Sequence, residues 1–243
     1  MKKTNPYIYL KNKENRNISE ILKNRFFYSL THFFIKYIII KNGIIEVVKM
    51  KIILASQSPR RIALMELAKI DFEVMSSNKE EKKIKDGINI DEQSKEVAYQ
   101  KALDVFNNTQ GDRAIIGADT IVVKDNKVFG KPTDRKEAIK MLKELQNDVH
   151  TIYTSLAILI EEKGQYKEYK ELVKTNVTVH SMTEQEIVEY VDTEEPYDKA
   201  GAYAIQSCFA KYIDEIEGNY MSVIGLPIDK IYKILKENEI LKY

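Results

Sequence analysis

The chain has 243 residues, of which 44% are hydrophobic and 31% charged, enough for one sizeable α/β domain or one domain with two lobes. The net charge of +1 argues against a general binder of nucleic acid polymers. A single cysteine, Cys208, excludes an intrachain disulfide and predicts a cytoplasmic protein, and we expect its thiol to be buried.

Residues 1–49 differ in charge from the rest of the chain. They hold 10 Lys+Arg against 3 Asp+Glu, whereas residues 50–243 hold 28 against 34. Lys36 and Lys41 interrupt the apolar stretch 26–48, so we expect no stable membrane insertion, although an amphipathic helix on a membrane surface is one alternative. The other is that Met50 is the true start, because a strand follows it directly. We therefore expect a basic extension over 1–49, mis-assigned or disordered, and one domain over 50–243.

After Met50, strands and helices alternate in the first half of the chain. Hydrophobic periodicity predicts a buried strand over 51–55, a helix over 59–69, a short strand over 72–75, a charged loop over 79–91 and a helix over 92–107. The next stretch, AIIGADTIVV, predicts a strand interrupted by a turn at Gly-Ala-Asp. Asp125 and Asn126 then predict the turn of a β-hairpin.

The second half is rich in strands. Asp134 with Glu137, and Thr183 with Glu186, each predict a capping box at the start of a helix. Between those helices lie two predicted long strands, 151–160 and 166–179, and short strands are expected between Ser207 and the closing helix after Pro227. This order of elements predicts an α/β fold, with a mixed central sheet and flanking helices.

The stretch ILASQSPRR predicts a site for an anion. Ser58 suits an N-cap and Pro59 the first helical position, which places Arg60 and Arg61 in the first turn of a helix. The helix dipole disfavours cations there, whereas a phosphate would be bound by the guanidinium groups and by the unpaired N–H donors. Removing either arginine should therefore hold or raise the stability of the ligand-free protein. The alternative is two solvated surface arginines.

Several other residues could carry chemistry, although each signal is weak alone. Asp119 lies in an apolar run, where a carboxylate is energetically costly unless it is paired, solvated in a cleft or bound to a metal. The alternative to such a site is a turn aspartate bonded to its own backbone. Lys131 precedes Pro132 and could point into the same cleft, or be a surface lysine. Glu80 and Glu81 could ligate Mg²⁺ or form a solvated face. Gln206 could pair with the edge of a base.

Five ordered blocks together resemble the Maf (septum-formation) family of nucleoside triphosphate pyrophosphatases. The blocks are ASQSPRR, GADTIVV, GKPTD, EPYDKAGAYAIQ and IEGNYMSVIGLP, and the resemblance covers Met50 to about Glu237. It implies a fold similar to that of inosine triphosphate pyrophosphatases, with two lobes around a deep cleft. It also implies hydrolysis of a nucleoside triphosphate to the monophosphate and pyrophosphate with a divalent metal, Mg²⁺ or Mn²⁺. The glutamine of GAYAIQ is similar to that of the branch acting on dTTP and UTP.

The resemblance also implies roles for individual residues. Asp119 matches the proton acceptor of the family, and the selectivity positions fall on Arg61, Thr120 and Gln206. The residues expected to bind phosphate are Ser56, Arg60, Arg61, Lys101 and Lys131, and those expected to bind metal are Asp119, Glu80 and Glu81. Ser155 and Ser207 stand where the family usually has glycine, and we expect both to narrow the cleft.

The function that the resemblance implies is a pyrophosphatase for dTTP and UTP that is linked to cell division arrest. Two other functions are left open. One is a house-cleaning pyrophosphatase for modified nucleotides, and the other a non-catalytic, nucleotide-binding regulator of septum formation. Asp119 disfavours the second, because a pure binder gains nothing from a carboxylate beside a triphosphate. The expected ligands are nucleoside triphosphates, and a homodimer is left open.

Overall fold

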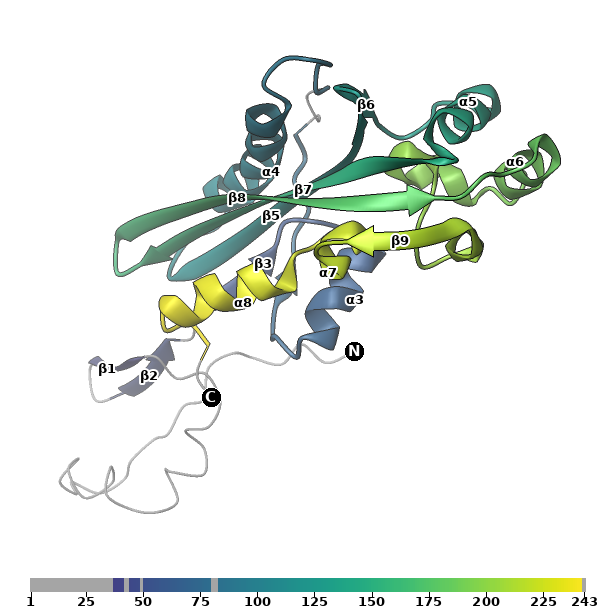
Figure 1. Ribbon diagram of the computed structural model, residues 1–243. Helices are drawn as coiled ribbons and strands as arrows, with labels where there is room; N and C mark the ends of the chain where they lie inside the picture. Colours follow the sequence, from purple (N-terminus) through teal and green to yellow (C-terminus); the bar gives the residue numbers. More distant parts are fainter. Residues whose placement is uncertain (1–36, 42–43, 49, 80–82, 242–243) are drawn as a thin grey trace.

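The computed structural model of the protein describes residues 37–41, 44–48, 50–79 and 83–241 (Figure 1). Within them, seven strands form one sheet in the order β4-β3-β5-β7-β8-β9, with β6 paired to β5. These strands are β3 (Lys51–Leu54), β4 (Glu73–Val74), β5 (Arg113–Lys124), β6 (Lys127–Phe129), β7 (Asp148–Glu162), β8 (Gln165–Val179) and β9 (Ile213–Glu217). β3 is parallel to β4 and β5 and the other pairs are antiparallel, so the predicted mixed sheet is confirmed.

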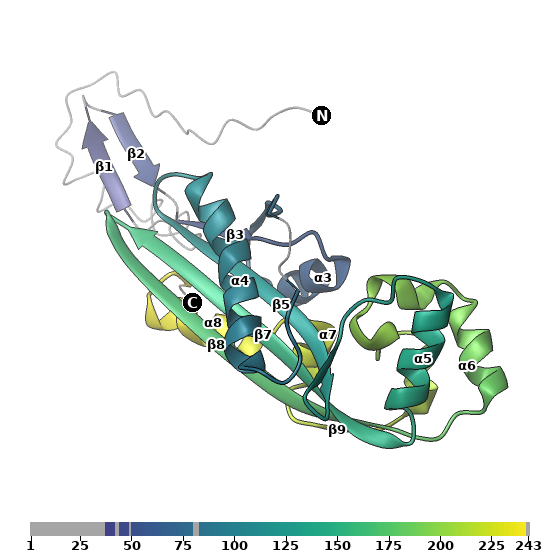
Figure 2. The same cartoon turned by 90° about the horizontal axis from the view of Figure 1, so that it is seen from above.

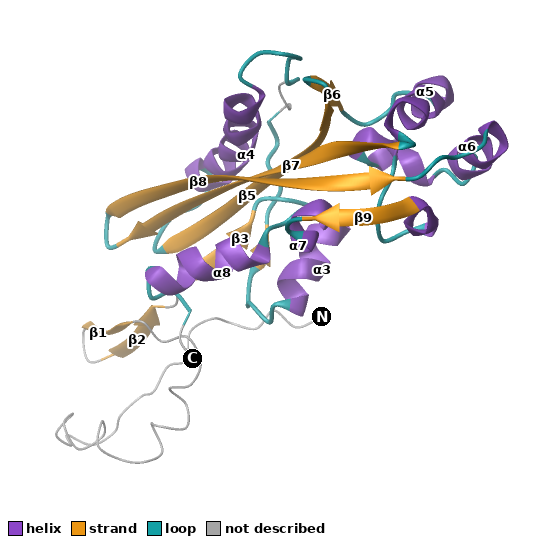
Figure 3. Cartoon of the chain, viewed as in Figure 1, coloured by secondary structure: helices purple, strands orange, loops and turns teal. Residues whose placement is uncertain are grey.

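Helices cover both faces of this sheet (Figures 1 and 2). α4 (Ile90–Asn107) lies on one face, and α3 (Pro59–Leu67), α7 (Tyr220–Ile224) and α8 (Ile228–Glu237) lie on the other. α5 (Arg135–Leu145) and α6 (Glu184–Val191) pack against each other at one end of the long strands β7 and β8 (Figure 3). Three short 3-10 segments accompany them: η1 (Glu195–Asp198), η2 (Ala200–Ala202) and η3 (Cys208–Tyr212).

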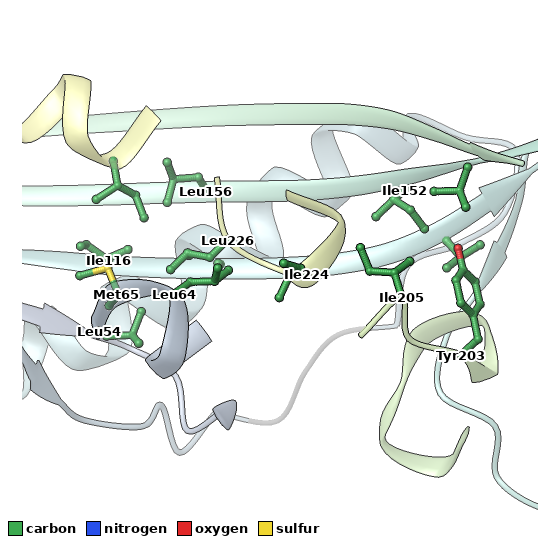
Figure 4. Close-up of a cluster of buried hydrophobic side chains, with 14 of the residues drawn as sticks. Leu54, Leu64, Met65, Ile116, Ile152, Leu156, Tyr203, Ile205, Ile224 and Leu226 are labelled. Carbon is green, nitrogen blue, oxygen red and sulfur yellow. The ribbon is translucent and has the colours of Figure 1, made fainter. Parts of the chain in front are cut away.

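One apolar core runs from the α3 side of the sheet into the region of α5 and α6 (Figure 4). Leu54, Met65 and Leu156 lie at one end of the cluster, and Ile152 and Tyr203 at the other. The segment that carries η2 is therefore packed onto the same sheet as α3. Two smaller apolar clusters lie apart from this core, one with residues of α4 and one around Ile121.

The expected break in β5 is wrong. β5 is continuous, and its residues 113–123 pair with β7 without interruption. Gly117 forms no turn but faces α4, where an added Cβ would lie 2.4 Å from the carbonyl oxygen of Ala98. A glycine here lets the helix approach the strand closely. The hairpin turn is confirmed, with φ of 50° at Asp125 and 59° at Asn126.

The helix caps agree with the sequence except in one detail. The Thr183–Glu186 capping box is complete. At α5 the Asp134 carboxylate accepts a hydrogen bond from the Glu137 N–H at 2.8 Å, but the Glu137 carboxylate accepts from Thr133 instead. Tyr220–Ile224, expected among short strands, is helical because the Asn219 side chain accepts from the Ser222 N–H at 2.9 Å.

Two further expectations fail within the described residues. Cys208 is exposed, because it begins η3 and the following Phe209 takes the buried position.

β1 (Tyr37–Lys41) and β2 (Ile44–Val48) form an antiparallel pair, so the amphipathic-helix alternative is wrong for these two segments. The remainder of 1–49 lies outside the described residues. Among the described helices, none is both long and apolar enough to cross a membrane.

We expect a chain that begins at Met50 to keep nearly the full melting temperature. The Met50 side chain is buried, and the main-chain ladder of the sheet begins at Lys51, whose N–H donates to the Asp112 carbonyl at 3.1 Å. Thermal unfolding of the full and shortened chains would be compared. A fall of several degrees would mean that residues 1–49 pack on the core.

Candidate active site

A cleft of about 590 Å³ opens beside β5, where one edge of that strand has no partner strand within the described residues. β3 pairs with residues 113–116 of β5 and β6 with residues 122–124, which leaves 117–121 open between them. Asp119 and Thr120 lie in this gap and line the cleft. Their side chains point to opposite faces of the strand, because successive residues of a strand alternate. The open edge gives both of them access to the same cleft.

Asp119 is paired with a lysine from α4. The Lys101 Nζ lies 2.8 Å from the Asp119 Oδ1, and the side chains are 13% and 11% exposed. So little exposure is costly for a carboxylate without a charged partner. The position within a strand rules out the turn aspartate, and the pairing places a carboxylate and an ammonium together at the wall of the cleft.

Arg61 is held by several bonds within the protein. Ser58 caps α3 as expected, although its side chain makes no capping bond. The Arg61 Nε donates to the Gly225 carbonyl at 2.9 Å, and its two terminal nitrogens donate to Ser56 Oγ at 3.2 Å and Thr120 Oγ1 at 3.4 Å. These bonds fix the guanidinium between β5 and the end of α7, and they offset its unfavourable place at the helix start.

Arg60 pairs with an acid that the sequence did not point to. Its Nη1 donates to the Asp198 Oδ2 at 3.0 Å, and Lys199 donates to the same carboxylate at 2.5 Å. Burial would raise the pKa of Asp198, but hydrogen bonds from Lys199 and Arg60 outweigh it and lower the pKa. The alternative of two solvated arginines is therefore wrong. One signal was present, since Asp198 lies within the EPYDKAGAYAIQ block, two residues before Ala200.

Lys131 and Gln206 line the same cleft as Asp119. Lys131 follows β6, and Gln206 follows η2 in a segment that is held at two points. The Gly201 N–H donates to the Gly130 carbonyl at 3.0 Å, with φ of 69° at Gly201. Thus the two glycines connect the segment before Gln206 to the end of β6.

The second attachment of the segment is a buried hydrogen bond. The Tyr203 hydroxyl lies 2.5 Å from the His150 Nε2, on β7. Burial lowers the pKa of His150 to about 4, so the imidazole is neutral near pH 7. The bond therefore joins two neutral groups and holds the residues before Gln206 against the sheet.

Neither serine that replaces a family glycine is among the residues that line the cleft. Ser155 is fully buried, and its Oγ lies 2.6 Å from the Ser94 Oγ on α4. Ser207 donates to the Ala204 carbonyl and accepts from the Phe209 N–H. The expectation that Ser155 and Ser207 narrow the cleft is wrong, because both hydroxyls are taken up by hydrogen bonds within the protein.

The described residues offer one carboxylate that fits a divalent metal at the open edge of β5. Glu80 and Glu81 lie outside the described residues, and within these no group of three or more His, Cys, Asp or Glu side chains could hold a metal ion. Mg²⁺ is commonly held by one or two carboxylates together with substrate phosphates and water. Asp119 fits that mode, with phosphate oxygens supplying further ligands.

The sequence matches the family profile described as Maf-like protein over residues 51–238. A protein of Thermoanaerobacter sp. (strain X514) named dTTP/UTP pyrophosphatase is 44% identical over 187 residues, which cover 77% of this chain and 96% of the relative. A protein of the same name from Alkaliphilus oremlandii (strain OhILAs) is 44% identical over 188 residues, with the same coverage. The solved structure of a HAM1 protein from Coxiella burnetii is 15% identical, with a TM-score of 0.43, and the match covers 77% of this chain and 99% of that one.

Proposed function

Because the chain belongs to the Maf-like protein family, we propose that it is a pyrophosphatase that hydrolyses dTTP and UTP to the monophosphate and pyrophosphate in the cytoplasm. The observation that carries this proposal is the excess of positive charge in one cleft, which six cations and three carboxylates line. Asp119 lines it together with Arg60, Arg61, Lys101 and Lys131. A triphosphate needs that density of positive charge, and hydrolysis needs a group that accepts the proton of water.

In the proposed reaction, water attacks the α-phosphorus. A bond forms between the water oxygen and phosphorus, the bond to the bridging oxygen breaks, and pyrophosphate leaves with the electron pair. Asp119 accepts the proton, and the Lys101 Nζ lies 2.8 Å from its Oδ1. Arg61 is already oriented by its bonds to Gly225 and Ser56, so little ordering is required when phosphate binds.

A divalent cation, Mg²⁺ or Mn²⁺, would be held by Asp119 together with phosphate oxygens, and Glu80 and Glu81 stay candidates for the same ion. Bound there, it would neutralise charge on the triphosphate. The cations from the protein supply the rest of that neutralisation, since Arg60 and Lys131 approach the cleft from different elements.

The nucleoside fits the part of the cleft near Gln206. Apolar side chains line that region, among them Ile152, Tyr203 and Ile205. Such a surface suits a base, while the Gln206 amide can pair with the O4 and N3–H edge of thymine or uracil. His150 supports this arrangement through Tyr203, three residues before Gln206.

Gln206→Glu is expected to weaken turnover of dTTP and UTP and to narrow their advantage over CTP. The carboxylate still accepts from N3–H but has no donor for O4, and it can accept from the amino group of cytosine. The measurement is kcat/KM for the three nucleotides. Gln57→Glu is the matched control, because it adds the same charge to an adjoining pocket that Arg60 and Arg61 also line, and it should lower all three values alike. Unchanged ratios in Gln206→Glu would mean that this side chain does not contact the base.

The proposed function is tested by pyrophosphate release from each common NTP and dNTP, with Mg²⁺ and with Mn²⁺. We expect dTTP and UTP to yield the monophosphate and pyrophosphate faster than the other nucleotides do. Release of orthophosphate would place the attack at another phosphorus, and no release from any nucleotide would overturn the proposal. Faster hydrolysis of modified nucleotides would favour the house-cleaning alternative.

A further inference from the structure

The cleft continues past the arginines into a smaller compartment of about 350 Å³. The two compartments share the side chains of Ser58, Arg60, Arg61, Lys101, Lys131 and Asp198. Beyond them, the smaller compartment is lined by the turn after β3 and the loop after β4, with Ser56, Gln57, Ser76, Ser77 and Lys79. Asp119 and Gln206 line only the larger compartment. The shared cations therefore stand at the junction of two chemically different spaces.

The walls of the two compartments suit different parts of a nucleotide. The larger one has apolar side chains such as Ile121 and Ile205, which can pack on a base and a sugar. The smaller one has hydroxyl, amide and cationic groups and one carboxylate, Asp198, which is bonded to Arg60, and Ala55 and Pro59 are its apolar members. Cations and hydroxyl donors suit phosphate groups, so the smaller compartment fits the end of the substrate that carries no base.

The loop that bears Lys79 is tied to α4. The Asp104 Oδ2 accepts from the Ser77 hydroxyl at 3.0 Å and from the Asn78 N–H at 2.8 Å. The Lys79 Nζ donates to the Gln100 Oε1 at 3.1 Å, and Gln100 directly precedes Lys101. One helix thus positions both lysines, Lys101 at the junction and Lys79 further into the smaller compartment.

We propose that the smaller compartment is the leaving-group site, which binds the β- and γ-phosphates and then holds pyrophosphate, and that Lys79 is a further binding residue there. This inference rests on the proposed function. When the bond between the α-phosphorus and the bridging oxygen breaks, that oxygen takes the electron pair into the pyrophosphate. An ammonium near the pyrophosphate stabilises the added charge, whereas the monophosphate stays with Asp119 and Gln206.

Lys79→Ala in the full chain is the test, and Lys83→Ala is its matched control. Both lysines are exposed and belong to the same loop, but Lys83 lines only the larger compartment. Three quantities are measured: the inhibition constant of pyrophosphate, the Kd of UMP, and kcat/KM for UTP. Lys79→Ala should weaken inhibition by pyrophosphate about fivefold, as expected for loss of a charge contact of ~1 kcal/mol, and leave UMP binding unchanged. Lys79→Arg should restore most of the inhibition.

The outcomes separate this inference from the proposed function. If the unaltered chain releases no pyrophosphate from any nucleotide, the proposed function fails and the inference fails with it. If that chain is active but Lys79→Ala is inhibited as strongly by pyrophosphate, the leaving-group site is overturned and the proposed function stands. The leaving-group site is also overturned if Lys83→Ala weakens pyrophosphate inhibition as much as Lys79→Ala does. It is likewise overturned if Lys79→Ala weakens UMP binding as much as it weakens pyrophosphate inhibition. Equal melting temperatures of the two alanine variants would exclude unfolding as the cause.

Discussion

Asp119→Asn is expected to lower kcat by about 10²–10⁴-fold, the usual worth of a positioned acid or base. The amide keeps the shape of the carboxylate, but it cannot accept the proton of the attacking water. It is also a weaker ligand for a divalent cation. The measurement is steady-state pyrophosphate release from UTP, with the fold verified by thermal unfolding. Activity within a fewfold of the unaltered chain would move the role elsewhere, with Glu80 and Glu81 the next candidates.

The ion pair between Asp119 and Lys101 gives the Asp119→Asn variant a second measurable effect, a change in melting temperature. Asparagine replaces the carboxylate that lies 2.8 Å from the Lys101 ammonium, which is 13% exposed, so the melting temperature should fall although the fold is kept. Glu137→Gln is the matched control, since it makes the same change to another carboxylate that lines the cleft. That carboxylate bonds to Thr133 at the start of α5, and its loss should cost stability but leave kcat within a fewfold.

Arg61→Ala is expected to lower kcat/KM at least tenfold and also to lower the melting temperature. The variant loses three hydrogen bonds, to Gly225, Ser56 and Thr120. Each is worth about 0.5–1.5 kcal/mol, whereas relief of the unfavourable helix dipole returns about 0.3–1 kcal/mol. The bonds outweigh the dipole, so the structure reverses the stability change that the sequence alone predicts.

Arg60→Ala is the comparison for that variant. It removes an ion pair whose partners are 32% and 62% exposed, worth about 0–1 kcal/mol, so its melting temperature should change little. In both variants the rise in melting temperature caused by UTP with Mg²⁺ should shrink, because stabilisation by a ligand follows its affinity. A melting temperature for Arg61→Ala above that of the unaltered chain would show that its three bonds do not stabilise the protein.

The sequence predicted those features that depend on neighbouring residues. The cap at Thr183, the hairpin turn at Asp125 and the start of α3 at Pro59 are each set within a few positions of the chain. The ordered blocks also brought Asp119, Lys131 and Gln206 into one predicted site, and the structure places all three along one cleft. Their roles in the reaction stay predictions.

What the sequence missed depends on contacts between distant residues. Gly-Ala-Asp resembles a turn locally, but Gly117 is required by the approach of Ala98 on α4. The partner of Arg60 lies 138 positions away, so no local pattern could pair it with Asp198. Likewise, Ser155 finds its hydroxyl partner, Ser94, on a helix 61 positions earlier.

The unbroken pairing of β5 with β7 limits which insertions and deletions the part of the gene that encodes β5 can accept. Asp119 and Thr120 are neighbours whose side chains leave the strand on opposite sides, and the ladder from Arg113 onward fixes which side each takes. Deleting one codon between them and Arg113 would send the carboxylate toward Arg61 and the hydroxyl toward Lys101. A two-codon change would keep the sides but shift both groups by two positions along the strand, away from their partners Lys101 and Arg61. Variation among descendants of this chain should therefore consist of substitutions in β5, with insertions and deletions confined to its two ends.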